Sequence, residues 1–334
     1  MWMIPYLSLF AYESSLKLRL LYDGRNDGPR FTEGVSRTLE RSRHTLKLFE
    51  DTARGVDGQI AWYHDKVVHP SREYFIEKIK VPFLRSLGKD LGVFSYDNVP
   101  ISNTHAAAFL LGVDADILFG PPEPLGDILM STMGGYGQYF AQWGANLDPA
   151  ATSFMVEMDA SRFVPGRDVR SQGYYTSVFN GASTPDINAL LSLFQALMNV
   201  VAMLLPLDTT EASRQTVIKL QFLTTYHVIR SLKQLALVHG SKLTDTSLAT
   251  IEQIALQEMA VLATSDAAKV LRISLVHYDI HSRIELSDLA IDSLLYGLVE
   301  ATLSMPVELF ATRLQELASF VAGQFNNWER LGSS

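Results

Sequence analysis

Ile187–Leu207 reads INALLSLFQALMNVVAMLLPL, and none of its 21 residues carries a charge. About 20 apolar residues suffice either to cross a bilayer or to fill the core of a helical protein. Asn188, Ser192, Gln195 and Asn199 recur at helical spacing, so they form one narrow polar stripe. Buried polar groups need hydrogen-bond partners, which a neighbouring helix can supply along such a stripe. The segment is therefore predicted to be a buried core or interface helix, with no membrane span.

The composition of the 334-residue chain is that of a globular protein. Hydrophobic residues make up 47% and charged residues 19%, so some of the apolar surface is expected in subunit contacts. The net charge of −8 gives no whole-chain basic field that would attract nucleic acid. The chain contains no cysteine, which excludes disulfides, cysteine nucleophiles and thiolate metal sites. The apolar N-terminal stretch lacks the basic region and cleavage site of a signal peptide.

Helical patterns occupy both ends of the chain. Residues 30–54 place apolar and charged side chains on opposite sides of a predicted surface helix. A second amphipathic helix is predicted over 71–89, with Ser71 as its N-cap and a bend or break at Pro82. Residues 92–103 are predicted to be a loop.

The middle of the chain changes character. Helical patterning returns at Thr184-Pro185-Asp186, where proline takes the first helical position, and continues to the C-terminal end. Residues 112–183 instead alternate glycine and proline with aromatic residues, and Phe154–Asp159 has the pattern of a short strand or extended loop. The predicted fold class is mainly α. A helical core domain, 1–111 with 184–334, carries an irregular loop and short-strand central insertion at 112–183.

His277, Asp279 and His281 are the candidate metal ligands. Two imidazoles and a carboxylate suit zinc or ferrous iron. In a strand over 271–281 all three side chains would point to one face, whereas in a helix Asp279 would point away. The alternative is two histidines on a polar surface, with Asp279 paired to Arg283 four residues later.

Three shorter patterns have structural explanations beside functional ones. Asp114 and Asp116 form a DxD pair that could hold a divalent cation, or could cap a loop after a buried segment. His64-Asp65 could be an acid–base pair, but no serine nucleophile in a recognisable elbow accompanies it, and polar side chains on an exposed loop are the alternative. Met133–Asn146, rich in glycine and aromatic residues, could cradle a ligand or form a flexible contact surface.

A small basic patch lies on the predicted helix 30–54. Arg37, Arg41, Arg43 and Lys47 could contact phosphate backbones without sequence specificity. Glu40 and Glu50 partly neutralise these charges, so a solvated helix face is the alternative interpretation.

One motif at the start of the central region resembles a known family. Phe119–Met130 reads FGPPEPLGDILM, in which Pro122, Pro124, Leu125 and Leu129 resemble the PGPLxxxF element of partitivirus coat proteins. Glu123 stands where that pattern has glycine, and Leu129 where it has phenylalanine. The element spans only eight residues of the chain.

The resemblance implies a capsid protein that dimerises and closes into a small icosahedral shell around double-stranded RNA. It implies a helical shell-like domain, with 112–183 as the protruding dimerisation region and Pro122, Pro124, Leu125 and Leu129 as a structural corner. The expected partners are further copies of the chain and double-stranded RNA, bound without sequence specificity by the basic patch. The expected location is the virion and the host cytoplasm, and no catalytic residue or cofactor is expected.

Two other functions stay open at the level of sequence. An all-helical, metal-dependent enzyme would use His277, Asp279 and His281, with a pocket lined by the aromatic central segment. A membrane-anchored protein would use Ile187–Leu207 and would need detergent to stay in solution.

Overall fold

The computed structural model describes residues 4–21, 36, 39–42, 45, 55–111, 124–144, 159–181, 183–207, 211–278, 280–290 and 292–330. The chain forms two compact units. The first comprises Met1–Thr52 with Asp57–Tyr174, and the second comprises Ala53–Val56 with Tyr175–Ser334. The protein is mainly α with a few short strands, which confirms the predicted fold class. The division into a core domain and an insertion at 112–183 stays a prediction. The main division of the chain into the two units falls between Tyr174 and Tyr175.

The first unit combines helices with one small sheet. Its elements in chain order are α1 (Ile4–Leu21), α3 (Gly55–Tyr63), π-helix η1 (His64–Val68), α4 (His69–Arg72), π-helix η2 (Glu73–Glu77), 3-10 helix η3 (Pro82–Leu87), β1 (Leu91–Tyr96), β2 (Val99–Asn103), α5 (Thr104–Leu111), α7 (Pro124–Gly144), 3-10 helix η4 (Ala160–Arg162) and β3 (Phe163–Val169). Helix α9 (Ser171–Gly181) carries the chain from this unit into the second.

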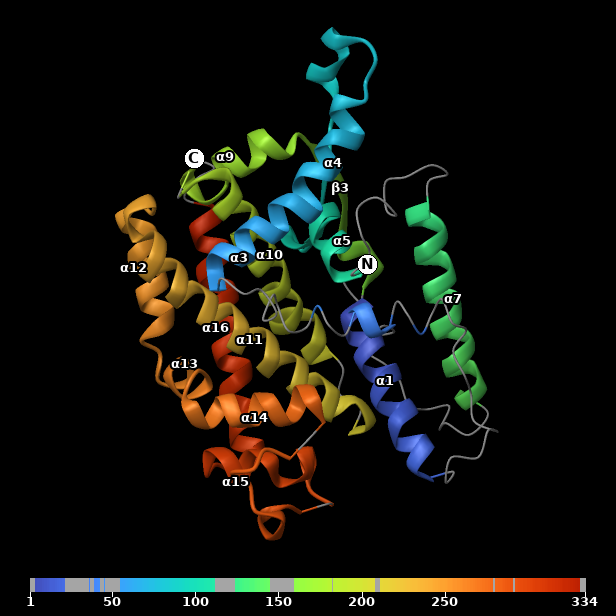
Figure 1. The fold of residues 1–334 in the computed structure, drawn as a ribbon, viewed down its shortest axis with the longest axis vertical. Coiled ribbons are helices and arrows are strands. Elements are labelled where there is room, and N and C mark those ends of the chain that lie inside the picture. The colour runs from blue at the N-terminus through green and yellow to red at the C-terminus, as the bar shows by residue number, and fades with distance from the viewer. Residues whose placement is uncertain are drawn as a thin grey trace. The chain divides into compact units, whose positions relative to one another are not determined.

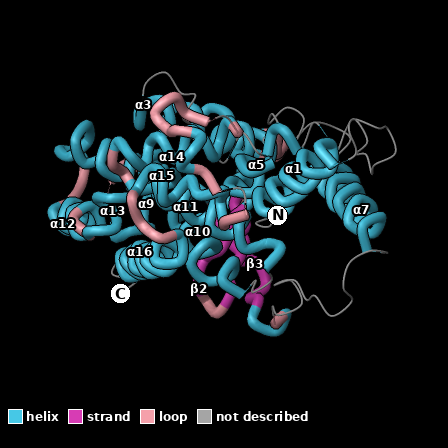
Figure 2. Tube along the Cα trace, turned by 90° about the horizontal axis from the view of Figure 1, so that it is seen from below, coloured by secondary structure: helices cyan, strands magenta, loops and turns pink. Residues whose placement is uncertain are grey.

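The sheet has the order β2-β1-β3, and both pairings are antiparallel. Figure 2 shows these three strands in magenta. The predicted loop at 92–103 is wrong, because β1 and β2 form a hairpin there. Asp97 and Asn98 make the two-residue turn with φ of 50° and 62°, the left-handed conformation that tight hairpins require and that Asp and Asn tolerate. Pro100 is accommodated because β2 is an edge strand.

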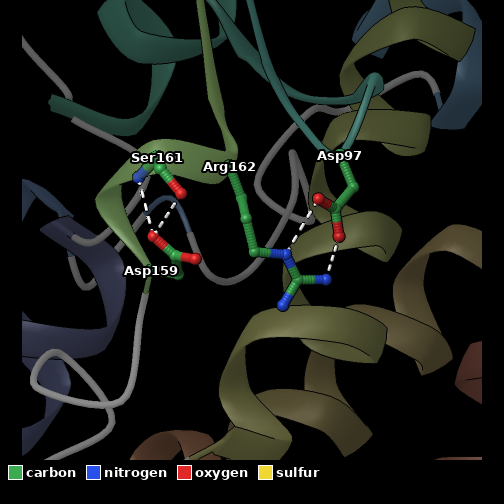
Figure 3. Close-up of polar contacts among 4 residues, drawn as sticks. All are labelled: Asp97, Asp159, Ser161 and Arg162. Carbon is green, nitrogen blue, oxygen red and sulfur yellow. Dashed lines mark hydrogen bonds and ion pairs between the residues drawn. The ribbon is translucent and has the colours of Figure 1, made fainter.

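A charged pair ties this hairpin turn to the segment before β3 (Figure 3). Arg162 Nε donates to Asp97 Oδ1 at 2.8 Å, and a second guanidinium nitrogen contacts the other carboxylate oxygen. The hydrogen bond from Arg162 holds the pKa of Asp97 below its usual value. Asp159 Oδ1 caps the short η4 by accepting from the backbone and hydroxyl of Ser161 at 2.8 and 2.6 Å. Both carboxylates therefore order the turn beside the sheet.

The predicted helix 71–89 begins earlier and ends earlier than expected. Helical structure runs without a break from Gly55 to Glu77, so Ser71 lies inside it and is not an N-cap. Pro70 is tolerated because η1 widens the turn before it, and His69 N–H donates five residues back to His64 O. A proline has no N–H and its ring clashes with the preceding turn of a regular helix, and a π-turn relieves both problems.

The second unit consists of helices. Its elements after α9 are α10 (Pro185–Asn199), π-helix η5 (Val200–Leu204), 3-10 helix η6 (Leu205–Leu207), α11 (Glu211–His239), 3-10 helix η7 (Gly240–Lys242), α12 (Asp245–Ala255), α13 (Glu258–Ala263), α14 (Asp266–His277), 3-10 helices η8 (Leu286–Asp288) and η9 (Leu294–Gly297), α15 (Leu298–Leu303) and α16 (Val307–Arg330). Within this unit α16 packs against both α10 and α11 (Figure 1).

The uncharged segment is a buried helix, as predicted. Thr184 is its N-cap and Pro185 lies in its first turn. Two residues of the polar stripe find partners on α16. Asn199 and Asn326 exchange amide hydrogen bonds of 3.0 and 2.9 Å. Gln195 Nε2 donates to Asn326 Oδ1 at 3.1 Å and to Glu329 Oε2 at 2.7 Å. These bonds join two helices that are more than 120 positions apart in the chain.

Pro185–Leu207 is long and apolar enough to cross a membrane by length and composition, and 67% of its most apolar window is buried inside the protein. A bent pair of helices, Leu294–Leu303 with Val307–Glu329, meets the same criteria if taken together. The partners of Gln195 and Asn199 on α16 explain how the first segment fits a protein core.

Replacing Asn326 by leucine should destabilise the second unit, because the buried amide of Asn199 then loses the two hydrogen bonds that it exchanges with α16. We expect the free energy of unfolding to fall by about 2 kcal/mol, measured by urea unfolding. Asn327→Leu is the matched control, because Asn327 is adjacent and exposed, and its effect should stay within about 0.5 kcal/mol. The double variant Asn199→Leu, Asn326→Leu should cost less than the sum of the single changes, and additive costs would contradict the pairing.

His227 on α11 should make the protein sensitive to acid. Burial, followed by the nearby positive charge of Arg230, lowers the pKa of His227 to about 3, so the folded protein holds this imidazole neutral. The unfolded chain takes up a proton below about pH 6.5, so stability present above that pH is lost as pH falls toward 3. We expect His227→Phe to reduce the loss of unfolding free energy between pH 7.5 and pH 4.5 by about 2 kcal/mol. Equal pH dependence in both proteins would refute this role.

Candidate self-association surface

The first unit carries an exposed tip at residues 78–89, between the end of η2 and the start of β1. In Figure 1 this segment extends beyond the body of its unit, after α4. All eight residues from Lys80 to Leu87 are exposed. Phe83 is 75% exposed and Leu87 is 73% exposed, while the neighbouring Val81 and Leu84 are about two-fifths exposed. A contiguous group of apolar side chains in water marks an interaction surface.

Local sequence explains the shape of the tip. Val81 is extended because it precedes a proline, and Pro82 then starts the 3-10 helix η3. Arg85 Nε donates to Ile79 O at 3.1 Å, which links the outgoing and returning chain. Gly88 lets the chain return closely, since a Cβ there would lie 3.1 Å from Ile79 Cδ1. The tip is therefore an ordered turn held by its own contacts.

A buried polar cluster, which we call the lock, holds the base of the tip. It consists of Ser71, Asp90, His105 and Ser171, each no more than 3% exposed. Ser71 Oγ donates to Asp90 O at 3.2 Å, joining the two arms of the tip. The carboxylate of Asp90 accepts from Ser171 N at 2.7 Å and from Ser171 Oγ at 2.5 Å, at the start of α9. The lock thus ties helix, strand and α9 together.

The lock contains serine, histidine and aspartate, yet its hydrogen bonds are not those of a nucleophilic triad. The hydroxyl of Ser171 donates to Asp90, whereas a nucleophile must donate to the histidine that will accept its proton. Burial lowers the pKa of His105 to about 4, although the charge and backbone of Asp90 oppose that shift. The folded protein therefore holds this buried imidazole neutral.

The predicted RNA-contact residues are only partly within the described chain. Arg41 lies on a helical segment between buried residues Leu39 and Ser42, and is partly exposed. Arg37, Arg43 and Lys47 lie outside the described residues, so the basic patch stays a prediction.

Two of the predicted metal ligands, His277 and His281, do not lie on a strand. Helix α14 ends at His277, and Tyr278 follows in the left-handed conformation. His281 accepts from Arg283 N through Nδ1 at 3.2 Å. Within the residues that the structure describes, no three His, Asp or Glu side chains are placed to hold a metal ion. Asp279 lies outside these residues, so the set of His277, Asp279 and His281 stays an untested prediction.

The remaining sequence motifs fall mostly in α7 or beyond the described chain. Pro124 is the first residue of α7, which contains Leu125 and Leu129, whereas Pro122 lies outside the described residues. The DxD pair at 114–116 lies outside them as well.

The glycine- and aromatic-rich stretch is not a flexible loop, because residues up to Gly144 belong to α7. Tyr136 and Tyr139 on this helix contact the hydroxyls of Ser8 and Ser14 on α1 at 2.6 and 3.0 Å.

His64 Nδ1 and Asp65 Oδ1 lie 2.9 Å apart within η1, and the acid–base role stays a prediction. Their side chains are 39% and 71% exposed.

Comparison with known proteins adds no family to these observations. No protein-family model matches the sequence, no curated protein resembles it significantly, and no solved structure matches its fold.

Sequence reasoning missed the tip, although its signals are present. Lys78, Lys80, Arg85 and Lys89 give residues 78–89 a charge of +4 with no acidic residue. The predicted helix over 71–89 placed its apolar residues against a core, whereas the turn at Val81-Pro82 exposes them. The exposure of an apolar side chain depends on what covers it, which local sequence does not specify.

Replacing Phe83 and Leu87 together by serine should weaken self-association and leave the fold intact. Both side chains are largely exposed, so the unfolding free energy should change by less than about 1 kcal/mol. Sedimentation velocity across a range of concentrations would measure association. Leu237→Ser is the control, because Leu237 on α11 is 86% exposed and far from the tip in sequence. Unchanged association of the Phe83, Leu87 variant would exclude the tip as a contact.

Proposed function

We propose that this protein is a structural, self-assembling protein, and that its assembly is a coat around double-stranded RNA. The observation that carries self-assembly is the exposed apolar tip on an ordered base. Phe83 and Leu87 keep about three-quarters of their surface in water, while buried hydrogen bonds of Asp90 to Ser71 and Ser171 fix the chain that presents them. A rigid apolar projection favours association, because burying it releases water at little conformational cost.

The coat-protein part of the proposal has two supports. The first is the resemblance of the segment containing Pro122, Pro124, Leu125 and Leu129 to the partitivirus motif. The second is the charge distribution, because a net charge of −8 with only local basic groups suits a shell that surrounds a duplex without neutralising it. Arg37, Arg41, Arg43 and Lys47 are the proposed RNA contacts, and the virion and host cytoplasm are the proposed locations.

The purified recombinant protein should form regular particles tens of nanometres across, visible by light scattering and negative-stain microscopy. Particles lost in the Phe83→Ser, Leu87→Ser variant would connect assembly to the tip. A monomer or small oligomer at all concentrations would overturn the proposal.

The RNA role is tested separately on the assembled protein. Arg41→Glu with Arg43→Glu should lower the RNA content of the particles, measured by the absorbance ratio at 260 and 280 nm, because phosphate contacts supply most non-specific affinity. The fold should be retained, since Arg41 is partly exposed and such a charge contributes little to stability. Lys66→Glu with Lys242→Glu changes the net charge equally at exposed positions elsewhere and should leave RNA content unchanged. Equal RNA content in all three proteins would remove the basic patch from the proposal.

A further inference from the structure

The tip presents two kinds of chemistry to a partner. Its apolar side chains, led by Phe83 and Leu87, are framed by basic residues on both sides. Lys80 and Lys89 are exposed and form no ion pair with any part of the described chain. A surface that covers the tip must therefore offer apolar contact together with carboxylates.

The second unit carries a surface with the opposite charge. Residues 284–312 contain no basic residue and include five acidic ones, Glu285, Asp288, Asp292, Glu300 and Glu308. The side chains of Glu285, Asp288 and Asp292 are exposed, with Leu286 between them 72% exposed and Tyr296 45% exposed. We call residues 285–296 the acidic loop.

The other two acidic side chains of this stretch are already engaged. Glu300 Oε1 accepts from Val307 N at 2.9 Å, and Glu308 forms an ion pair with Arg214. The carboxylates left to face a partner are therefore those of the acidic loop, beside its exposed apolar side chains.

The acidic loop is held compactly by backbone hydrogen bonds. Ala290 N donates to Tyr296 O at 3.1 Å, and Tyr296 N donates to Ser293 O at 2.9 Å. Gly297 closes the loop with a φ of 75°, and a Cβ there would lie 3.0 Å from Ala290 N. The loop is visible beside α15 in Figure 1. Its exposed carboxylates and leucine are thus presented on a fixed backbone, as the tip presents its own groups.

We propose that the tip of one copy docks on the acidic loop of a second copy. This inference rests on the proposed function and names the contact through which assembly proceeds. The tip carries +4, so the rest of the chain carries −12 (−8 minus 4), and a second copy is an electrostatically attractive partner. The contact joins two different surfaces, so each copy keeps a vacant tip or loop and assembly continues until the structure closes.

The composition of the tip favours a protein partner over a nucleic acid. Five of the eight exposed residues from Lys80 to Leu87 are apolar, and a phosphate backbone would leave them in water. One such contact is expected to be weak, and many repeated contacts in an assembly act together. Weak repeated contacts suit an assembly that must form reversibly.

Reciprocal charge reversal tests the docking on the full-length protein. The tip-reversed variant is Lys80→Glu with Lys89→Glu, and the loop-reversed variant is Glu285→Lys with Asp288→Lys. Each should raise the concentration at which half the protein is assembled about tenfold or more. The net charge of the tip falls from +4 to 0 in the first variant, and that of the loop changes from −3 to +1 in the second, so the attraction between tip and loop is lost. An equimolar mixture should assemble within about threefold of the wild type. Each unaltered surface then meets its unaltered partner, and the carboxylates introduced on the tip of one variant meet the amines introduced on the loop of the other. Lys66→Glu with Lys242→Glu is the charge-matched control for the tip and should assemble normally.

The outcomes separate this inference from the function on which it rests. If both reversed variants form particles at the same concentration as the wild type, the docking is overturned and self-assembly is left standing. A wild type that never assembles would overturn both. Failure of the mixture, with recovery only when all four changes occupy one chain, would indicate a contact within a copy and refute the second-copy partner. Loss in the tip-reversed variant alone, together with lost binding to phosphatidylserine vesicles, would assign the tip to a lipid surface instead.

Discussion

A buried amide must find its hydrogen-bond partners inside the protein, and this constraint organises the second unit. Asn199 and Asn326 satisfy each other by exchanging two hydrogen bonds, which is possible at only one register of α10 against α16. Leucine-to-leucine packing alone tolerates small shifts along a helix, whereas a reciprocal amide pair does not. The same rule continues at η5, where Gln221 and Gln315 donate to the carbonyls of Val201 and Ala202, both at 3.0 Å. The position of α16 is therefore set by polar contacts within an apolar core.

In the first unit, the buried polar group that needs hydrogen-bond partners inside the protein is a carboxylate. Asp90 is buried, and its hydrogen bonds to Ser71 and Ser171 connect the outgoing helix, the returning strand and the start of α9. These hydrogen bonds fix the chain at the base of the tip. Phe83 and Leu87 therefore stay exposed to water and do not pack against their own unit. An assembly contact requires exposed apolar side chains on an ordered backbone, because little conformational entropy is then lost on association.

Sequence patterns predicted helices well where the periodicity was long and one-sided. The polar stripe of Ile187–Leu207 predicted a buried helix, and the structure confirms its burial. Gln195 and Asn199 bond to α16, whereas Asn188 donates to Tyr175 O on α9. The predicted secondary structure was wrong in two stretches that are rich in turn-forming residues or glycine. Asp97-Asn98 makes a tight hairpin turn in a stretch expected to be a loop, and the glycines of α7 lie in a helix expected to be flexible. Packing of Tyr136 and Tyr139 against α1 stabilises that helix despite the low helix propensity of glycine.

The sequence by itself determined the mainly α character, the core position of the uncharged helix and the local charges of the tip and the acidic loop. These properties follow from the order of residues, because periodicity and charge are local. Only the tertiary structure decided that α16 pairs with α10, that Asp90 joins segments 81 positions apart, and that Phe83 stays in water. Long-range partners and exposure depend on which surfaces the whole chain brings together, so no local pattern encodes them.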